Sequence, residues 1–221
     1  MALESARTAQ FGEGWSALAT AAETDGSAHH PLIVRLTAPN PLARDLADAV
    51  HALVMLHGRQ PGVLDHAMAR NAQPAWSGWF EAAVESFVAE RALLAKLASA
   101  AGPLPSTPGQ AESEAAIIAQ RHALETLAKS DRSGCAIGAA IAMVIEWRVI
   151  RRLLDAAGER FGVATRVCVL PIESETATIV ASALEKPATE RAMAFGVQQL
   201  LAQHRGLWDL LEARASARNH A

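Results

Sequence analysis

Hydrophobic residues recur along most of this chain at the spacing of one helix face, and proline and glycine fall between these periodic segments. The pattern predicts long helices over 40–58, 75–102, 107–130, 134–162 and 188–215, with shorter helices over 60–70 and 173–186. Asn40 is the expected N-cap of the first long helix, and Thr107, followed by Pro108, that of the third. Residues 163–171 alternate and predict a short extended segment, and 29–37 could be extended and pair with it.

The segment 134–162 is the most apolar of these helices, because no charged residue occurs from Gly134 to Ile145. Its apolar run is shorter than the ~20 residues that are needed to span a bilayer, and arginines follow this run directly. We therefore expect an all-α fold, a helical bundle of four to five long helices around a central apolar helix at about 134–162. Gly134 and Gly138 would let neighbouring helices approach closely. Residues 1–39 are expected to form an N-terminal segment, partly irregular, and residues 40–221 the helical-bundle domain.

Composition narrows the class of protein further. The chain has 221 residues, 51% hydrophobic and 19% charged, with a net charge of −3, which suits one folded domain. It contains no basic block, so nucleic acid is not an expected partner, and a membrane is not expected either. The two cysteines, Cys135 and Cys168, lie far apart, and the first residues lack the apolar core of a signal peptide. These features predict a cytoplasmic location.

Carboxylates occur on helix faces that should be buried. Glu90 and Arg91 border the apolar face of one long helix, Glu114 and Arg121 that of the next, and Glu146 continues the apolar row of the central helix. A buried carboxylate needs a partner to stay ionised. The favoured interpretation is a set of interhelical Arg–Glu pairs, in which Glu146 meets an arginine from a neighbouring helix. The alternatives are a metal or cofactor role and simple exposure.

Inward glutamates on several helices, over roughly residues 76–216, resemble the ferritin-like superfamily, whose carboxylates bind two metal ions. The resemblance implies metal ligation by Glu90, Glu114 and Glu146. The family's Glu-x-x-His signature is absent, because positions 93, 117 and 149 are Leu, Ile and Val. The nearest substitutes are Asp48-x-x-His51 and the reversed His122-x-x-Glu125. No cofactor is therefore predicted.

The stretch 57–67 carries the densest polar patch, with His57, Arg59, Asp65 and His66. An Asp–His pair could orient a base, the four residues could hold an anion at the helix N-terminus near Pro61, or they could tie a helix corner structurally. With Arg91 and Arg121 they are the candidate ligand-binding residues. His57 and His204 lie on apolar rows as core histidines, and the helix C-terminus would favour the charged form of His57.

No nucleotide-binding, zinc-protease or nucleophile motif occurs, so catalytic residues are not assigned and the chain is not classified as an enzyme or a non-enzyme. The leading hypothesis is a non-enzymatic cytoplasmic helical protein that acts through self-association or a protein partner. Trp76, Trp79, Trp147 and Trp208 suggest rings at a surface or interface, and hence a homodimer. The alternative is a diverged ferritin-like protein that binds a metal or small molecule in the bundle.

Overall fold

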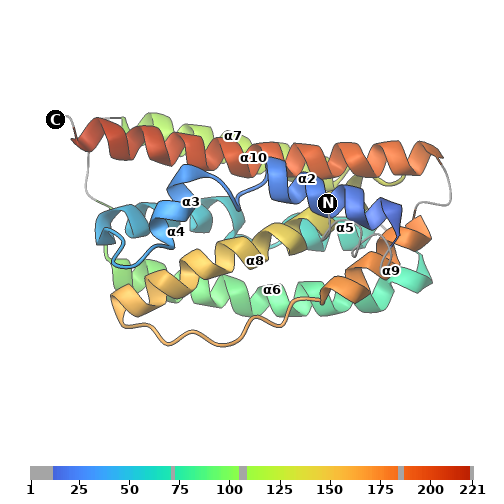
Figure 1. The fold of residues 1–221 in the computed structure, drawn as a ribbon, viewed down its shortest axis with the longest axis horizontal. Helices are drawn as coiled ribbons and strands as arrows, with labels where there is room; N and C mark the ends of the chain where they lie inside the picture. Colours follow the sequence, from blue (N-terminus) through green and yellow to red (C-terminus); the bar gives the residue numbers. More distant parts are fainter. Residues whose placement is uncertain (1–11, 71–72, 105–108, 184–186, 220–221) are drawn as a thin grey trace.

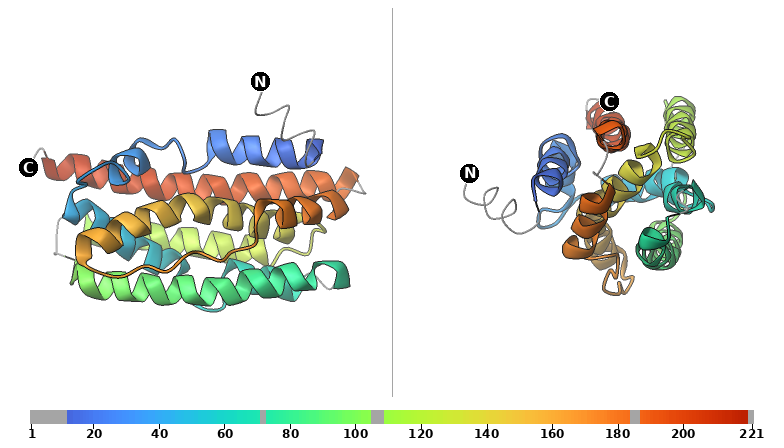
Figure 2. Two further views of the ribbon diagram at one scale, coloured as in Figure 1. Left: turned by 60° about the horizontal axis from the view of Figure 1, so that its bottom comes forward. Right: turned by 90° about the vertical axis from the view of Figure 1, so that its right-hand side faces the viewer.

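The computed structural model describes residues 12–70, 73–104, 109–183 and 187–219, and within these ranges every regular element is a helix. The all-α class predicted from the sequence is confirmed, and the helices pack as an elongated bundle (Figures 1 and 2). The helices are α2 (Glu13–Asp25), α3 (Pro31–Leu36), α4 (Ala43–His57), α5 (Val63–Arg70), α6 (Pro74–Ala101), α7 (Gln110–Ala128), α8 (Cys135–Phe161), α9 (Glu173–Ala183) and α10 (Pro187–Asn219).

Helix α8 is the most deeply buried element, and it runs obliquely between α10 and α6 (Figure 1). Every residue from Cys135 to Val144 is buried, as the uncharged run predicts. Glycines on both helices explain its close packing against α10. A Cβ added at Gly138 would lie 2.2 Å from the Met193 carbonyl oxygen, and one at Gly196 would lie 2.2 Å from the Cys135 carbonyl oxygen. The expected close approach at Gly138 is confirmed.

The helix boundaries differ from the predicted ones mainly at their starts. Helix α4 begins at Ala43 rather than after Asn40, because Asn40 has a φ of 56° and the chain turns there before the helix starts. Helix α5 begins at Val63, two residues after Pro61. The expected cap formed by Thr107 and Pro108 lies outside the described residues.

The N-terminal segment contributes α2 and α3 to the same hydrophobic core as the other helices. The prediction of extended structure over 29–37 was wrong, because residues 31–36 form α3. The His30 side chain accepts a hydrogen bond from the Leu32 N–H, and Pro31 occupies the first helical position. This capping outweighs the β-branched composition of a short segment.

Residues 163–171 form neither a helix nor a strand paired with another strand. The segment runs along the outside of α6 and α8 (Figure 2). Its carbonyl groups are bound by side chains instead: Ser86 donates to the Val169 carbonyl at 3.0 Å, and arginines of α8 donate to the carbonyls of Arg166 and Pro171. Inward Leu170 is buried, whereas Val167 is 86% and Val169 67% exposed.

The four tryptophans named as surface candidates are all buried, so that prediction was wrong. Each indole N–H donates a hydrogen bond to a side chain of the protein, which removes the need for contact with water. The acceptors are Ser182 for Trp76, Thr176 for Trp79, Glu90 for Trp147 and Ser27 for Trp208. Over the described ranges, none of the helices combines the length and the apolar character that crossing a membrane requires.

Candidate functional site

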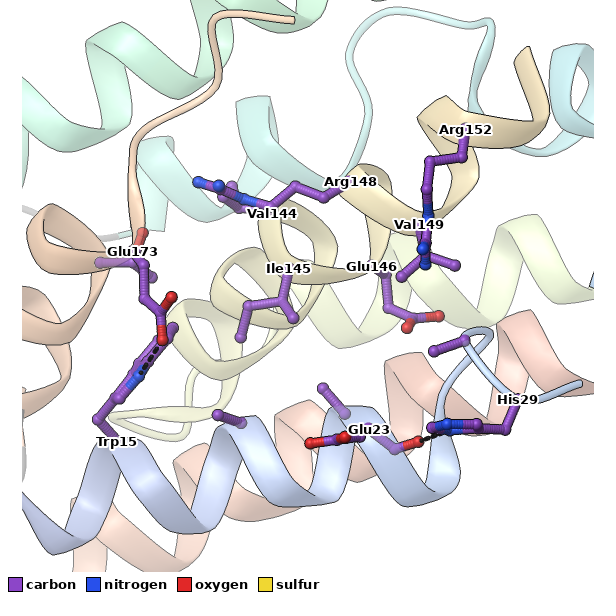
Figure 3. Close-up of a pocket in the computed structure, with 14 residues that line it drawn as sticks. Trp15, Glu23, His29, Val144, Ile145, Glu146, Arg148, Val149, Arg152 and Glu173 are labelled. Atoms are coloured by element: carbon purple, nitrogen blue, oxygen red, sulfur yellow. Dashed lines mark hydrogen bonds between the residues drawn. The ribbon is translucent and has the colours of Figure 1, made fainter. Parts of the chain in front are cut away.

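A cavity with a volume of about 420 Å³ lies between α2 and α8, close to the start of α9 (Figure 3). Its apolar wall comes from both helices. Ile145 projects toward the space in Figure 3, and Trp15 with Glu173 closes one end, while Glu23 and His29 lie at the other. The apolar lining residues are Trp15, Ala19, Ala22, Ala28, Val144, Ile145 and Val149.

Two arginines of α8 line the same cavity. Arg148 and Arg152 are four residues apart and so lie on one face of the helix. Arg148 donates to the Pro171 carbonyl. Among the residues that the structure describes, Arg152 has no hydrogen bond or ion pair, and it is exposed. In the sequence, these arginines stand out only as charges after an apolar run, although their spacing of four residues was a usable signal.

The acidic groups of the cavity are already engaged. Glu173 accepts a hydrogen bond from the Trp15 indole N–H at 3.0 Å. At the other end, His29 Nδ1 lies 2.8 Å from the Glu23 carbonyl oxygen. Glu23 also takes part in a further interaction with the protein. Two of the lining carboxylates, Glu146 and Glu173, therefore already accept hydrogen bonds from protein groups.

Glu146 forms part of the inner wall and is fully buried. Its carboxylate accepts from the Ser27 N–H at 3.1 Å and from the Ser27 hydroxyl at 2.5 Å. The third partner is His204 Nδ1, 3.1 Å from Oε2. The prediction that Glu146 meets an arginine was wrong: a serine 119 residues earlier and a histidine of α10 take that place. Hydrogen bonds from several donors can hold a buried carboxylate as well as a guanidinium can.

A chain of buried polar groups continues from Glu146 across the bundle. Because a carboxylate only accepts, His204 donates from Nδ1 to Glu146, and its Nε2 lies 3.0 Å from Nε2 of His57. Burial lowers the pKa of His57 well below its usual value of 6.5, and the nearby His204 and Arg91 lower it further. The expected stabilisation of charged His57 by the helix end is therefore overruled by desolvation.

The predicted Arg–Glu pairing does occur at Glu90. Arg151 of α8 donates to Glu90 Oε1 at 3.1 Å, and the Trp147 indole donates to Oε2 at 2.9 Å. Glu90 is 4% exposed, so this interhelical pair is buried. Glu114 behaves differently, because it accepts from Gln110 of its own helix at 2.6 Å. The three carboxylates named as metal candidates thus have three separate sets of partners.

No group of three or more His, Cys, Asp or Glu side chains that could hold a metal ion occurs among the described residues. Of the nearest substitutes for the ferritin-like signature, His51 contacts the Gly102 carbonyl oxygen at 2.8 Å, and Asp48 pairs with Arg218. Both side chains, which would be the substitute metal ligands, thus already bind other groups of the protein.

The predicted ligand-binding residues gather at the corner of α4, α5, α6 and α7. His57, Arg59, Arg91 and Arg121 line one small cavity there. Asp65 lies beside it, with Arg91 Nη2 at 2.5 Å and the Gly62 N–H at 2.8 Å from Oδ2. Asp65 is therefore held by Arg91 and by the backbone. Its carboxylate does not hydrogen-bond to His66, as it would in an Asp–His pair that orients a general base.

His66 is half-buried and stands apart from this cavity. Its pKa is lowered, first by burial and then by Lys129, against opposing effects of Glu125 and Asp65. Sequence reasoning thus found most of this corner. It missed Ser27 and the role of His204, because their partner Glu146 lies far away along the chain. It also missed Arg152, because the cavity beside it forms only in the folded chain.

Comparison with known proteins gives a family but no described activity. No curated protein and no solved structure matches the chain. A family model with the description "Family of unknown function (DUF6975)" matches residues 22–219, which include the helices from α3 to α10 but only the end of α2. The chain belongs to this family.

Proposed function

We propose that the protein binds a small molecule with an apolar body and one anionic group in the cavity between α2 and α8. The observation that carries this proposal is an apolar-walled space of about 420 Å³ beside an arginine, Arg152, that has no partner among the described residues. Cavities of ~300–1,000 Å³ with an apolar lining and a few polar groups are typical of small-molecule sites. The proposal takes up the small-molecule part of the ferritin-like alternative and leaves its metal part aside.

The charges around the cavity favour an anion over a cation. Glu146 and Glu173 already accept hydrogen bonds from protein donors, so a cationic ligand would have to compete for them. Arg152 has no partner for its donors among the described residues, and Arg148 donates to the Pro171 carbonyl. A guanidinium gains most from a planar anionic group such as a carboxylate or sulfonate.

The hydrogen bonds that Glu146 already accepts favour binding over catalysis. A general base needs a free lone pair within reach of a substrate, whereas this carboxylate faces two donors of Ser27 and one of His204. Glu146 instead fixes the turn after α2 to α8. It thereby holds one wall of the cavity in place. We also propose α8 as the element around which the bundle is built, since it supplies the other wall.

Two fluorescent probes test the proposal. Anilinonaphthalene sulfonate has an aromatic body and a sulfonate, and N-phenylnaphthylamine has nearly the same body without the charge. The native protein should bind both and prefer the sulfonate. Arg152→Gln should weaken sulfonate binding about tenfold, the size of one charge-assisted hydrogen bond, and leave the neutral probe unchanged.

Arg160→Gln is the matched control, because Arg160 is also an exposed arginine of α8 but does not line the cavity. It should bind both probes as the wild type does. Equal loss of both probes in Arg152→Gln, or equal sulfonate affinity in the two variants, would contradict an anion contact at Arg152.

A second candidate function, self-association, is favoured by the exposed apolar side chains of one segment. Val167, Val169 and Ile172 are 86%, 67% and 57% exposed, and the first two alternate with inward residues. An extended segment with an apolar outer face is suited to pairing with another chain. We propose a homodimer through residues 163–172 as the route to the self-association expected from the sequence.

Sedimentation velocity tests the dimer directly. The wild type should sediment as a dimer at high micromolar concentration, and the double variant Val167→Lys, Val169→Lys should be monomeric with an unchanged helix content. The control, Val88→Lys, removes a half-exposed valine from α6 and should remain dimeric. A monomeric wild type would remove this candidate function.

A further inference from the structure

A second and much smaller cavity lies at the corner where α4, α5, α6 and α7 meet. Its volume is about 10 Å³, which is close to the minimum that one water-sized species occupies. The lining includes His57, Gly62, Arg91, Arg121 and Leu124. Two guanidinium groups, one from α6 and one from α7, therefore border a space that admits only a single small occupant.

Arg91 is buried and incompletely paired. Its side chain is only 8% exposed. Its Nη2 binds Asp65, and the guanidinium lies over the Phe87 ring at 4.8 Å from the ring centroid. Its Nε and Nη1 are buried and have no hydrogen-bond partner among the described residues. Buried donors of a charged group are costly to leave unpaired, so they call for an occupant of the cavity.

Arg121 adds a second incomplete group to the same lining. Its Nη1 donates to the Met55 carbonyl at 3.3 Å, and its Nε lies 3.6 Å from Glu125 Oε1, beyond hydrogen-bond distance. Its Nε is likewise buried without a hydrogen-bond partner among the described residues. The unpaired donors thus come from two different helices and border one space.

Gly62 permits this arrangement. A Cβ at position 62 would lie 2.9 Å from Arg91 Nη2, so any larger residue would push the guanidinium away from its position. The Gly62 N–H is already used, since it donates to Asp65 Oδ2 at 2.8 Å. The Gly62 N–H is therefore not available to a ligand, and the arginine side chains supply donors.

We propose that this cavity binds one small inorganic anion, such as chloride, between Arg91 and Arg121. Three arginines, Arg59, Arg91 and Arg121, line the cavity. Asp65 pairs with Arg91, and Glu125, which also lines the cavity, lies near Arg121, so exposed Arg59 supplies the one positive charge in excess. A water molecule could meet the donors but would leave the positive excess uncompensated, whereas an anion does both. The site is separate from the cavity between α2 and α8, so it does not rest on the proposed function.

Chloride NMR line broadening measures this binding directly, because bound chloride relaxes much faster than free chloride. The wild type should broaden the signal, and added bromide should reverse the effect by competition. Arg91→Lys keeps a charge for Asp65 but removes the Nε and second Nη donors, and it should weaken chloride binding at least tenfold. Arg121→Gln keeps the Arg91–Asp65 pair intact and should also weaken binding, which covers the case in which Arg91→Lys does not fold.

Arg160→Gln serves as the control for general surface binding and should broaden the signal as the wild type does. Thermal melts at equal ionic strength give a second measurement: chloride should raise the melting temperature more than gluconate, because a ligand of the native state stabilises it. Equal broadening by the wild type and both cavity variants, or equal stabilisation by the two salts, would overturn the proposal and leave water as the occupant.

Discussion

Replacing Glu146 with glutamine tests the buried network at its most constrained point. The carboxylate is fully buried and faces three donors: the Ser27 N–H, the Ser27 hydroxyl and His204 Nδ1. Glutamine keeps the shape but replaces one acceptor oxygen with an NH₂ group. Whichever way the amide is placed, at least one buried donor then faces another donor.

The expected magnitude follows from these contacts. A buried donor left unsatisfied costs roughly 1–3 kcal/mol, and hydrogen bonds to a charged acceptor are worth about 1.5–3 kcal/mol. His204 can change its tautomer and accept from the amide, which recovers part of the loss. We therefore expect Glu146→Gln to lower the free energy of unfolding by about 2–4 kcal/mol.

Urea denaturation followed by circular dichroism measures this change. The control is Glu159→Gln, an exposed position on the same helix, which should lie within about 0.5 kcal/mol of the wild type. Ser27→Ala, alone and combined with Glu146→Gln, gives a double-mutant cycle, and residues in one network should couple by about 0.5–3 kcal/mol. A loss below about 1 kcal/mol for Glu146→Gln, or full additivity with Ser27→Ala, would refute the reasoning.

Three further predictions follow from packing and burial. Gly26→Ala should cost about 1–3 kcal/mol, because its Cβ would lie 2.4 Å from Glu146 Oε1, whereas Gly78→Ala, with nothing within 4 Å, should gain about 0.5–1 kcal/mol; similar effects on the two melting temperatures would contradict this. The lowered pKa of His57 means that below about pH 6.5 the unfolded chain binds a proton that the native state does not, so stability present above this pH should fall on acidification by up to ~1.4 kcal/mol per pH unit. Urea titrations from neutral pH downward should show a flatter dependence in His57→Gln, and an unchanged slope would argue against the burial of a neutral His57. Ile141→Asp, at a fully buried position of α8, should cost several kcal/mol, and a soluble variant with an unchanged melting temperature would show that α8 is not the element on which the bundle depends.

The helices were predicted well where the hydrophobic periodicity and the positions of glycine and proline agree. The uncharged run before Glu146 and the glycine at position 162 define α8 nearly to the residue, since the helix spans Cys135–Phe161. The prediction failed at residues 31–36, where β-branched residues suggested a strand. There a local contact decided the structure, because the His30 side chain caps a short helix, and such a cap is not part of the usual sequence pattern.

The candidate site was predictable only in part. The positions on helix faces showed that Glu90 and Glu146 are buried, but not which groups they meet. Arg151 reaches Glu90 from α8, as the pairing hypothesis requires, whereas Ser27 reaches Glu146 from a turn after α2. A turn in an N-terminal segment has no periodicity that would place it against the core, so this partner depends on tertiary packing alone.

The cavity itself could not be read from the sequence. Its walls come from segments more than a hundred residues apart, and the apolar positions of α2 look like ordinary core residues. The one usable signal was the spacing of Arg148 and Arg152, which places two cations on one face of a mostly buried helix. Two arginines on one helix face occur on solvent-exposed surfaces as readily as in ligand sites. Only the cavity next to them, which the sequence does not reveal, distinguishes the two cases.

Filling the cavity tests the central claim most directly. Ile145 is half-buried and projects toward the space between α2 and α8 (Figure 3), so Ile145→Trp should occupy the volume that a ligand would use. The measurement is the affinity of this variant for anilinonaphthalene sulfonate under native conditions, with helix content and melting temperature recorded alongside. The account predicts at least a tenfold loss of affinity in a variant that remains folded. A folded Ile145→Trp protein that binds the probe as tightly as the wild type would contradict the account.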